Sequence, residues 1–98
     1  MFRLRPKPAP YTLSLVAQVY LKPDSAGHQE RLDITISASS ADANTHFSTE
    51  SVLKIRKNTF LYQASRGFIE HNGVHYSHHS IDRVVFGPVC SDAGVGPR

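Results

Sequence analysis

The sequence predicts an α+β fold: a small two-layer sandwich in which one helical segment covers an antiparallel sheet of about five strands. Three observations predict it. Two segments near the start alternate apolar and polar residues with a period of two, and the middle of the chain carries helix-start and helix-end signals. In the second half, Asn72-Gly73 stands between two short strand-like segments, which is the pattern of a tight β-hairpin. Strand runs on both sides of one helix favour the order β-β-α-β-β-β.

The length of 98 residues fits one domain with a modest core. We place that domain at residues 11–89. Residues 1–10 hold three prolines and three basic residues, so we expect an extended, basic, proline-rich arm there. Residues 90–98 hold two glycines and a proline, so we expect a flexible tail.

Residues 12–21 and 31–38 are predicted to be amphipathic strands that pair antiparallel. Between them, residues 22–27 read KPDSAG, which is typical of a turn. One face of this pair is apolar and needs a cover. We expect four side chains of that face to be buried against residues 40–64: Leu15, Val19, Ile34 and Ile36.

The cover is expected from residues 40–64. Ser39 or Ser40 can cap a helix there, and acidic residues come early while basic residues come late, which suits the helix dipole. A second, separate helix could begin at residues 48–50. Residues 48–64 can also be read as two short strands. We favour a helix, because the apolar face of the first hairpin must be covered. The expected apolar side of the helix consists of Val52, Leu53, Phe60, Leu61 and Ala64.

Residues 68–71 and 74–77 are predicted to form the second hairpin. A two-residue loop requires a positive φ at Gly73 and fixes the register. Residues 78–80 then connect to a last strand at residues 81–86. The expected cross-strand pairs are His71 with Val74, Glu70 with His75, and Ile69 with Tyr76.

Composition points to a globular protein outside the membrane, because 40% of the residues are hydrophobic and 19% are charged. No apolar run approaches a membrane span and no apolar signal-peptide segment follows the basic start, so we expect a cytoplasmic protein. Cys90 is the only cysteine, so no internal disulfide can form. None of the six glycines forms a glycine-rich loop between a strand and a helix, and we expect no cofactor.

Four of the six histidines lie between residues 67 and 86, close to Glu70 and Asp82. Imidazoles and carboxylates are the usual ligands of zinc. The histidine spacing fits no standard zinc site, so we interpret these residues as surface histidines and predict no metal site. Cys90 lies in an expected loop without a positioned base, and we predict that the protein is not an enzyme.

By elimination, we expect a small protein that docks onto a larger protein complex as an adaptor or inhibitor. Phages and other mobile elements encode many proteins of this kind. The contact is expected at a sheet edge or face. The expected contact residues lie on the polar face of the second hairpin, in the connector after it and on the first hairpin: Phe68, Glu70, His75, His78, His79 and Tyr20.

The alternative is a nucleic-acid-binding regulator that uses the basic stretch at residues 54–66. The net charge of +3 supports the nucleic-acid alternative only weakly, because four of the basic residues lie near the two chain ends. The sequence also allows a homodimer. The expected phosphate-contacting residues are Lys54, Arg56, Lys57 and Arg66.

Overall fold

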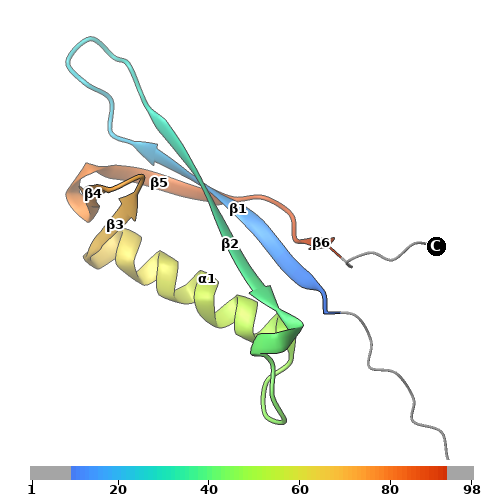
Figure 1. Cartoon of the computed structure of the whole chain (residues 1–98). Coiled ribbons are helices and arrows are strands. Elements are labelled where there is room, and N and C mark those ends of the chain that lie inside the picture. The colour runs from blue at the N-terminus through green and yellow to red at the C-terminus, as the bar shows by residue number, and fades with distance from the viewer. Residues whose placement is uncertain (1–9, 93–98) are drawn as a thin grey trace, which may run out of the picture.

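The computed structural model describes residues 10–92, so the expected arm (except residue 10) and residues 93–98 of the expected tail lie outside the described residues. Figure 1 shows a long twisted strand pair, one helix beside it and a short hairpin at the end of that helix. The strands are β1 (Thr12–Leu21), β2 (Arg31–Ser39), β3 (Phe68–His71), β4 (Val74–Ser77), β5 (Ile81–Phe86) and β6 (Cys90–Asp92). The helix is α1 (Thr49–Arg66), and single 3-10 turns, η1 and η2, occupy Ser40–Asp42 and His78–Ser80.

The predicted α+β class is confirmed, with an antiparallel sheet and one helix. Within the described residues β1 lies at the centre of the larger sheet, with β2 antiparallel on one side and β5 and β6 antiparallel on the other. β3 and β4 pair with each other in a sheet of their own, rather than joining a single five-stranded sheet. The first residues of the expected tail, Cys90–Asp92, form β6.

A one-residue shift of register separates β5 from β6. Gly87 still donates its N–H to the Val16 carbonyl at 2.9 Å, and continuing the β5 register would place Val89 opposite Ser14. The chain then returns to β1 and pairs Cys90 with Ser14. β1 is therefore covered along one side by two short strands in sequence.

The helix is confirmed over the alternative of two strands, and it begins later than residue 40. Ser48 is its N-cap and accepts a hydrogen bond from the Ser51 N–H at 3.1 Å. Ser39 instead caps the short turn η1, where Asp42 completes a capping box. Both sites of helix initiation found in the sequence are used, the first for a single turn and the second for α1.

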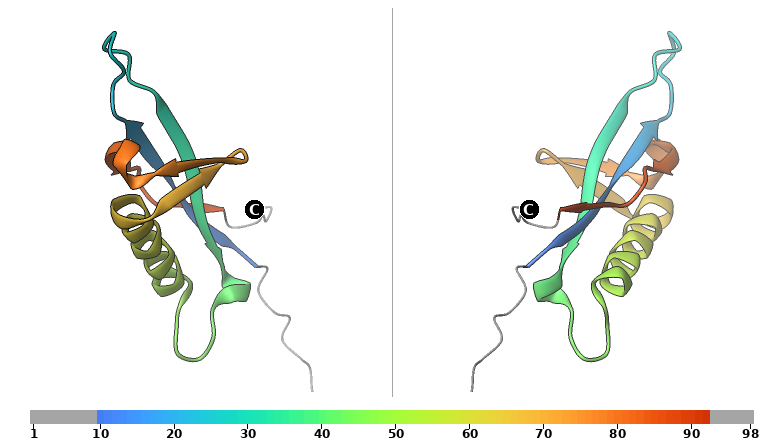
Figure 2. Two further views of the ribbon diagram at one scale, coloured as in Figure 1. Left: turned by 90° about the vertical axis from the view of Figure 1, so that its left-hand side faces the viewer. Right: turned by 90° about the vertical axis from the view of Figure 1, so that its right-hand side faces the viewer.

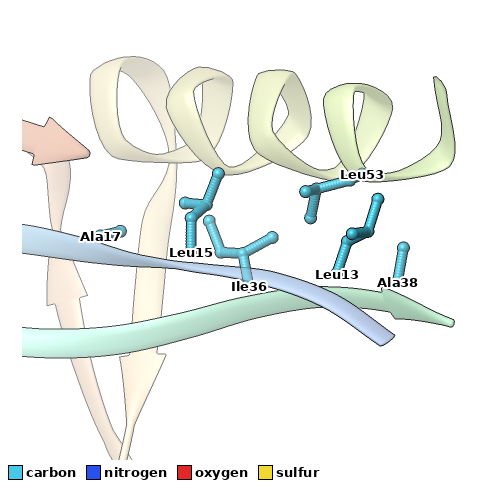
Figure 3. Close-up of a cluster of buried hydrophobic side chains, with 6 residues drawn as sticks. All are labelled: Leu13, Leu15, Ala17, Ile36, Ala38 and Leu53. Carbon is cyan, nitrogen blue, oxygen red and sulfur yellow. The ribbon is translucent and has the colours of Figure 1, made fainter. Parts of the chain in front are cut away.

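The core has two parts, which lie at opposite ends of the β1–β2 pair. α1 covers one end, where Leu53 packs onto β1 and β2 side chains, as Figure 3 shows. The end of α1 and the β3–β4 hairpin cover the other. The first part contains Leu13, Leu15, Ala17, Ile36, Ala38 and Leu53, and the second contains Val19, Leu21, Leu32, Ala64, Ile69 and Ile81.

Three of the four side chains expected to be buried are buried: Leu15, Val19 and Ile36. Ile34 is half-buried, because it lies on β2 at the margin of the sheet, where α1 covers it incompletely. On α1, Leu53 and Ala64 are buried as expected, whereas Leu61 is exposed.

The second hairpin has the predicted register in every pair. Asn72 and Gly73 have φ values of 54° and 79°, so both central turn residues are left-handed, as a tight hairpin requires. Ile69 and Tyr76 face the core. In Figure 2 the hairpin crosses the two long strands at a steep angle, which turns its other face to solvent.

Candidate protein-docking surfaces

Three of the predicted contact residues, Phe68, Glu70 and His75, come together on the outer face of the β3–β4 hairpin. The register pairs Glu70 with His75, and the two-residue alternation sets Phe68 on the same face. The Phe68 and His75 rings meet edge to face with centroids 5.0 Å apart. The His75 Nε2 atom lies 3.7 Å from Glu70 Oε1. We call these three residues the hairpin face.

Phe68 is unusual because an aromatic side chain at a strand start is left 56% exposed. Its neighbour Ile69 takes the buried position, so the pleat leaves Phe68 no route into the core. Val74 of β4 is also exposed, at 48%. The hairpin therefore presents apolar surface on a backbone that its turn and its core contacts hold in place.

The two connector histidines have different roles. His78 is half-buried, and its backbone N–H and its ring Nδ1 both reach the Gly67 carbonyl, at 2.9 and 3.0 Å. That carbonyl belongs to the C-cap of α1, so His78 ties the end of the hairpin to the end of the helix. His79 is exposed and its ring lies 4.0 Å from the His78 ring. Of these two, His79 is the one available to a partner.

Tyr20 lies on a different surface, the outer face of the larger sheet. Its cross-strand neighbours are Arg31 on β2 and Arg83 on β5. The Arg83 guanidinium sits 4.0 Å from the centroid of the Tyr20 ring. A hydrogen bond with Tyr20 and the nearby Asp33 carboxylate raise the pKa of Arg31. Strand order is set by long-range pairing, so this arrangement of Tyr20 between two arginines could not be read from local sequence.

The four basic residues of the nucleic-acid alternative do not gather on one surface. Arg56 donates from Nη1 to the Ser37 carbonyl at 2.7 Å and lies 3.5 Å from Asp42 Oδ2, on the β2 side of the helix. Lys57 instead places Nζ 4.7 Å from the centroid of the Phe86 ring, on the β5 side. Arg66 lies in the last turn of α1.

Lys54 borders an apolar groove between α1 and the β6 side of the sheet. The groove has a volume of about 220 Å³, and Lys57 and Glu50 also border it. The mixed charges at this border are less suited to a phosphate chain than a row of cations would be. The floor consists of Leu13, Leu15, Leu53 and Val89.

A second groove lies at the opposite margin of the sheet, between β2 and α1, and sequence reasoning did not find it. It is open, with a volume of about 430 Å³, and Ile34, Ile36 and Phe60 form its apolar part. Polar side chains of α1, Thr59 and Gln63, line the helix side. The alternation in β2 predicted a buried Ile34, and its half-buried position beside this groove is what the sequence did not indicate.

Two observations concern metal ligands and the cysteine in the part of the chain that the structure describes. Among residues 10–92, no group of three or more His, Cys, Asp or Glu side chains is arranged to hold a metal ion. Cys90 is exposed on β6, and its Sγ lies 3.8 Å from the Pro88 carbonyl oxygen. Within the same residues, no helix combines the length and the apolar character needed to cross a membrane.

Comparisons with protein-family models, with curated proteins and with solved structures find no match to this chain.

Proposed function

We propose that this protein is a non-enzymatic adaptor or inhibitor that docks onto a larger protein through the hairpin face. The observation that carries the proposal is Phe68, a large aromatic side chain that is 56% exposed at the start of the paired β3–β4 hairpin. Aromatic anchors surrounded by polar groups commonly dominate the binding energy of protein interfaces.

The surroundings of Phe68 suit such an anchor. The edge-to-face contact with His75 restricts the ring, so less side-chain entropy is lost when a partner buries it. The Glu70–His75 pair supplies a polar rim that can accept or donate hydrogen bonds. The exposed His79 extends the contact into the connector, whereas Val74 belongs to the opposite face with Ile69 and Tyr76.

The proposed mode of action is steric, through occupation of a partner's surface. A small domain that binds tightly can block a partner's surface or bridge two partners, with no chemistry of its own. A single cysteine suits a reducing compartment, which is consistent with action in the cytoplasm.

The nucleic-acid alternative has less support. Arg56 is bonded to Ser37 and Lys57 lies against Phe86, so the two cations point to opposite margins of α1. A phosphate backbone tracks a continuous basic surface, and Arg56 and Lys57 do not form one together.

The test is capture of a partner from the native host by the tagged protein, followed by mass spectrometry and by capture with variants. Phe68→Ser and His75→Glu should each fold and lose most of the captured partner. Capture should survive nuclease treatment and depend weakly on salt, because the anchor of the contact, Phe68, is apolar. Undiminished capture by both variants would exclude the hairpin face, and loss of capture with nuclease or moderate salt would favour nucleic acid.

A further inference from the structure

The two margins of the larger sheet differ in how they are protected. On one margin, the strands β5 and β6 are short, a register shift occurs opposite Tyr20 and Leu21, and Gly87-Pro88 interrupts the pairing. Short strands, irregularities and proline all discourage the addition of a further strand. On the other margin, β2 runs regularly for nine residues and contains neither glycine nor proline. Only the β2 margin, among the described strands of this sheet, has the form of a template for strand addition.

In an antiparallel pair, alternate residues of a strand bond to its neighbour, and this alternation identifies which backbone groups of β2 face outward. The bonds from Leu21 N–H to Glu30 O (2.9 Å) and from Ser40 N–H to Tyr11 O (2.8 Å) show that even-numbered residues of this segment bond to β1. The odd-numbered residues therefore direct their N–H and C=O groups away from β1. No described strand pairs with that side of β2.

At one end of the outward edge, backbone groups of β2 already have hydrogen-bond partners. Arg56 Nη1 donates to the Ser37 carbonyl at 2.7 Å, and the Ser39 N–H donates to Asp42 Oδ2 at 2.9 Å. The open stretch therefore runs over residues 31–35. The three residues that present both an outward N–H and an outward C=O are Arg31, Asp33 and Thr35.

On the helix side, the β2–α1 groove overlaps the open stretch at Ile34 and Thr35 and continues past it to Ser37 and Arg56. In an added strand every second side chain would face α1, so it would enter the groove beside Ile34, Ile36 and Phe60. On the other face, Arg31 and Asp33 lie side by side, with Arg31 Nε 3.0 Å from Asp33 Oδ1. A strand with an acidic residue opposite Arg31 and a basic residue opposite Asp33 would match both charges.

We propose that β2 binds an extended segment of a partner protein as an added antiparallel strand, with apolar side chains in the β2–α1 groove and opposite charges facing Arg31 and Asp33. A second copy of this chain fits less well. A two-fold pairing centred on the open stretch would set the two Asp33 carboxylates opposite each other, and like charges in that position destabilise a strand pair. The inference shares the proposed class of function, protein binding, but it uses a surface separate from the hairpin face.

The test is an NMR titration of the full chain with the capped peptide Val-Thr-Val-Lys-Val-Glu. Its Lys would lie opposite Asp33, its Glu opposite Arg31, and its three Val side chains on the groove side. Binding should slow hydrogen exchange at the amides of Arg31, Asp33 and Thr35, because these N–H groups acquire acceptors. The amides of Leu32 and Ile34 should change much less, since they already bond to β1.

Two matched controls sharpen the titration. The peptide Val-Thr-Val-Glu-Val-Lys has the same composition with exchanged charges, and it should bind about fivefold more weakly. The double variant Arg31→Glu, Asp33→Lys should reverse that preference. Thr35→Pro removes an outward N–H without removing a bond to β1 and should weaken binding by about tenfold, whereas Thr35→Val keeps the N–H and should bind normally.

Three outcomes would overturn the inference: no binding at about 1 mM peptide, equal binding of the two peptides, or changes centred on β5 or the hairpin. Slow exchange at the odd-numbered amides of the free protein, increasing with its concentration, would instead assign the β2 edge to a second copy. Phe68→Ser should leave peptide binding unchanged, so failure at the edge and failure of the hairpin face are separate results.

Discussion

The first hairpin, β1–β2, joins nine residue pairs, and every odd-numbered residue of β1 from Leu13 to Leu21 is buried. The second hairpin, β3–β4, joins four pairs, and Ile69 is the one strand residue that it buries. The long hairpin is held by its inner face, whereas the short hairpin is held by its turn, by Ile69 and Tyr76, and by the connector that follows it. Both hairpins leave an outer face to solvent. The difference is that the short hairpin carries the exposed aromatic Phe68 on its outer face, whereas β1–β2 offers a more polar outer face and a margin of β2 with which no described strand pairs.

The largest expected effect comes from the inner face of the first hairpin. Leu15 is 4% exposed and packs with Leu53 under α1, so Leu15→Ala should lower the free energy of unfolding by about 3 kcal/mol. Ile34→Ala should cost about 1 kcal/mol, because Ile34 is only half-buried. Thr35→Ala, on the outer face, should cost little. Urea denaturation checks the order, and similar losses for Leu15→Ala and Thr35→Ala would refute the assignment of faces.

The turn of the second hairpin should be the next most sensitive position. Gly73 has a φ of 79°, and a Cβ built there would meet no atom within 4 Å. Gly73→Val should therefore destabilise the protein through backbone strain alone, by about 2 kcal/mol. Asn72→Gly should change the stability by less than about 0.5 kcal/mol, since glycine also accepts this turn. Thermal unfolding of both variants measures the contrast, which would disappear if the turn were not left-handed.

The connector gives a smaller effect. His78→Ala removes the ring contact to the Gly67 carbonyl and should lower the unfolding free energy by about 1 kcal/mol. His79→Ala removes an exposed ring and should stay within about 0.5 kcal/mol of the wild type. Replacement of His75, His78 and His79 together by Gln should still give a folded protein. Equal stabilities for the two single variants would show that His78 does not tie the hairpin to the helix.

The smallest expected effect on the free energy of unfolding comes from Asp42, next to the end of β2, and it depends on pH. A hydrogen bond from the Ser39 backbone, together with the charge of Arg56, lowers the pKa of Asp42. Because this pKa is lower in the folded protein than in the unfolded chain, the ionised carboxylate stabilises the fold at neutral pH, and that contribution is lost as the pH falls through the folded-state pKa. Asp42→Ala should be less stable than the wild type at pH 7 and equal to it in strong acid. A difference that persists in strong acid would contradict this account.

The strands of both hairpins could be predicted because their signals are local. The alternation in β1 and β2 and the Asn72-Gly73 turn each lie within a few residues of the structure that they specify. The start of α1 was harder to predict from the sequence. Ser39 and Ser48 are equally good N-caps, and only packing decides which one precedes the long helix. Long-range pairing could not be predicted at all: β6 pairs with Thr12–Ser14 from the far end of the chain.

The candidate site residues divide in the same way, into those fixed by local signals and those placed by long-range pairing. Phe68, Glu70 and His75 were grouped correctly, because a two-residue turn fixes their common face. Tyr20 was expected on the first hairpin and lies there, but its position between Arg31 and Arg83 was not predicted, since strand order brings together residues that are distant in sequence. Arg56 was assigned to a phosphate surface but bonds to Ser37, which no local pattern indicates.

The comparison of the two hairpins is most directly tested by one pair of numbers for Phe68→Ser: its free energy of unfolding and its affinity for the captured partner. We predict a stability within about 0.5 kcal/mol of the wild type, because the side chain is exposed. We also predict a Kd raised by about thirtyfold or more, as for an interface hot spot. Tyr62→Ser, which removes a 64% exposed aromatic from α1, is the matched control and should leave both numbers unchanged. A folded Phe68→Ser variant with wild-type affinity would contradict the account, because the free face of the short hairpin would then have no part in recognition.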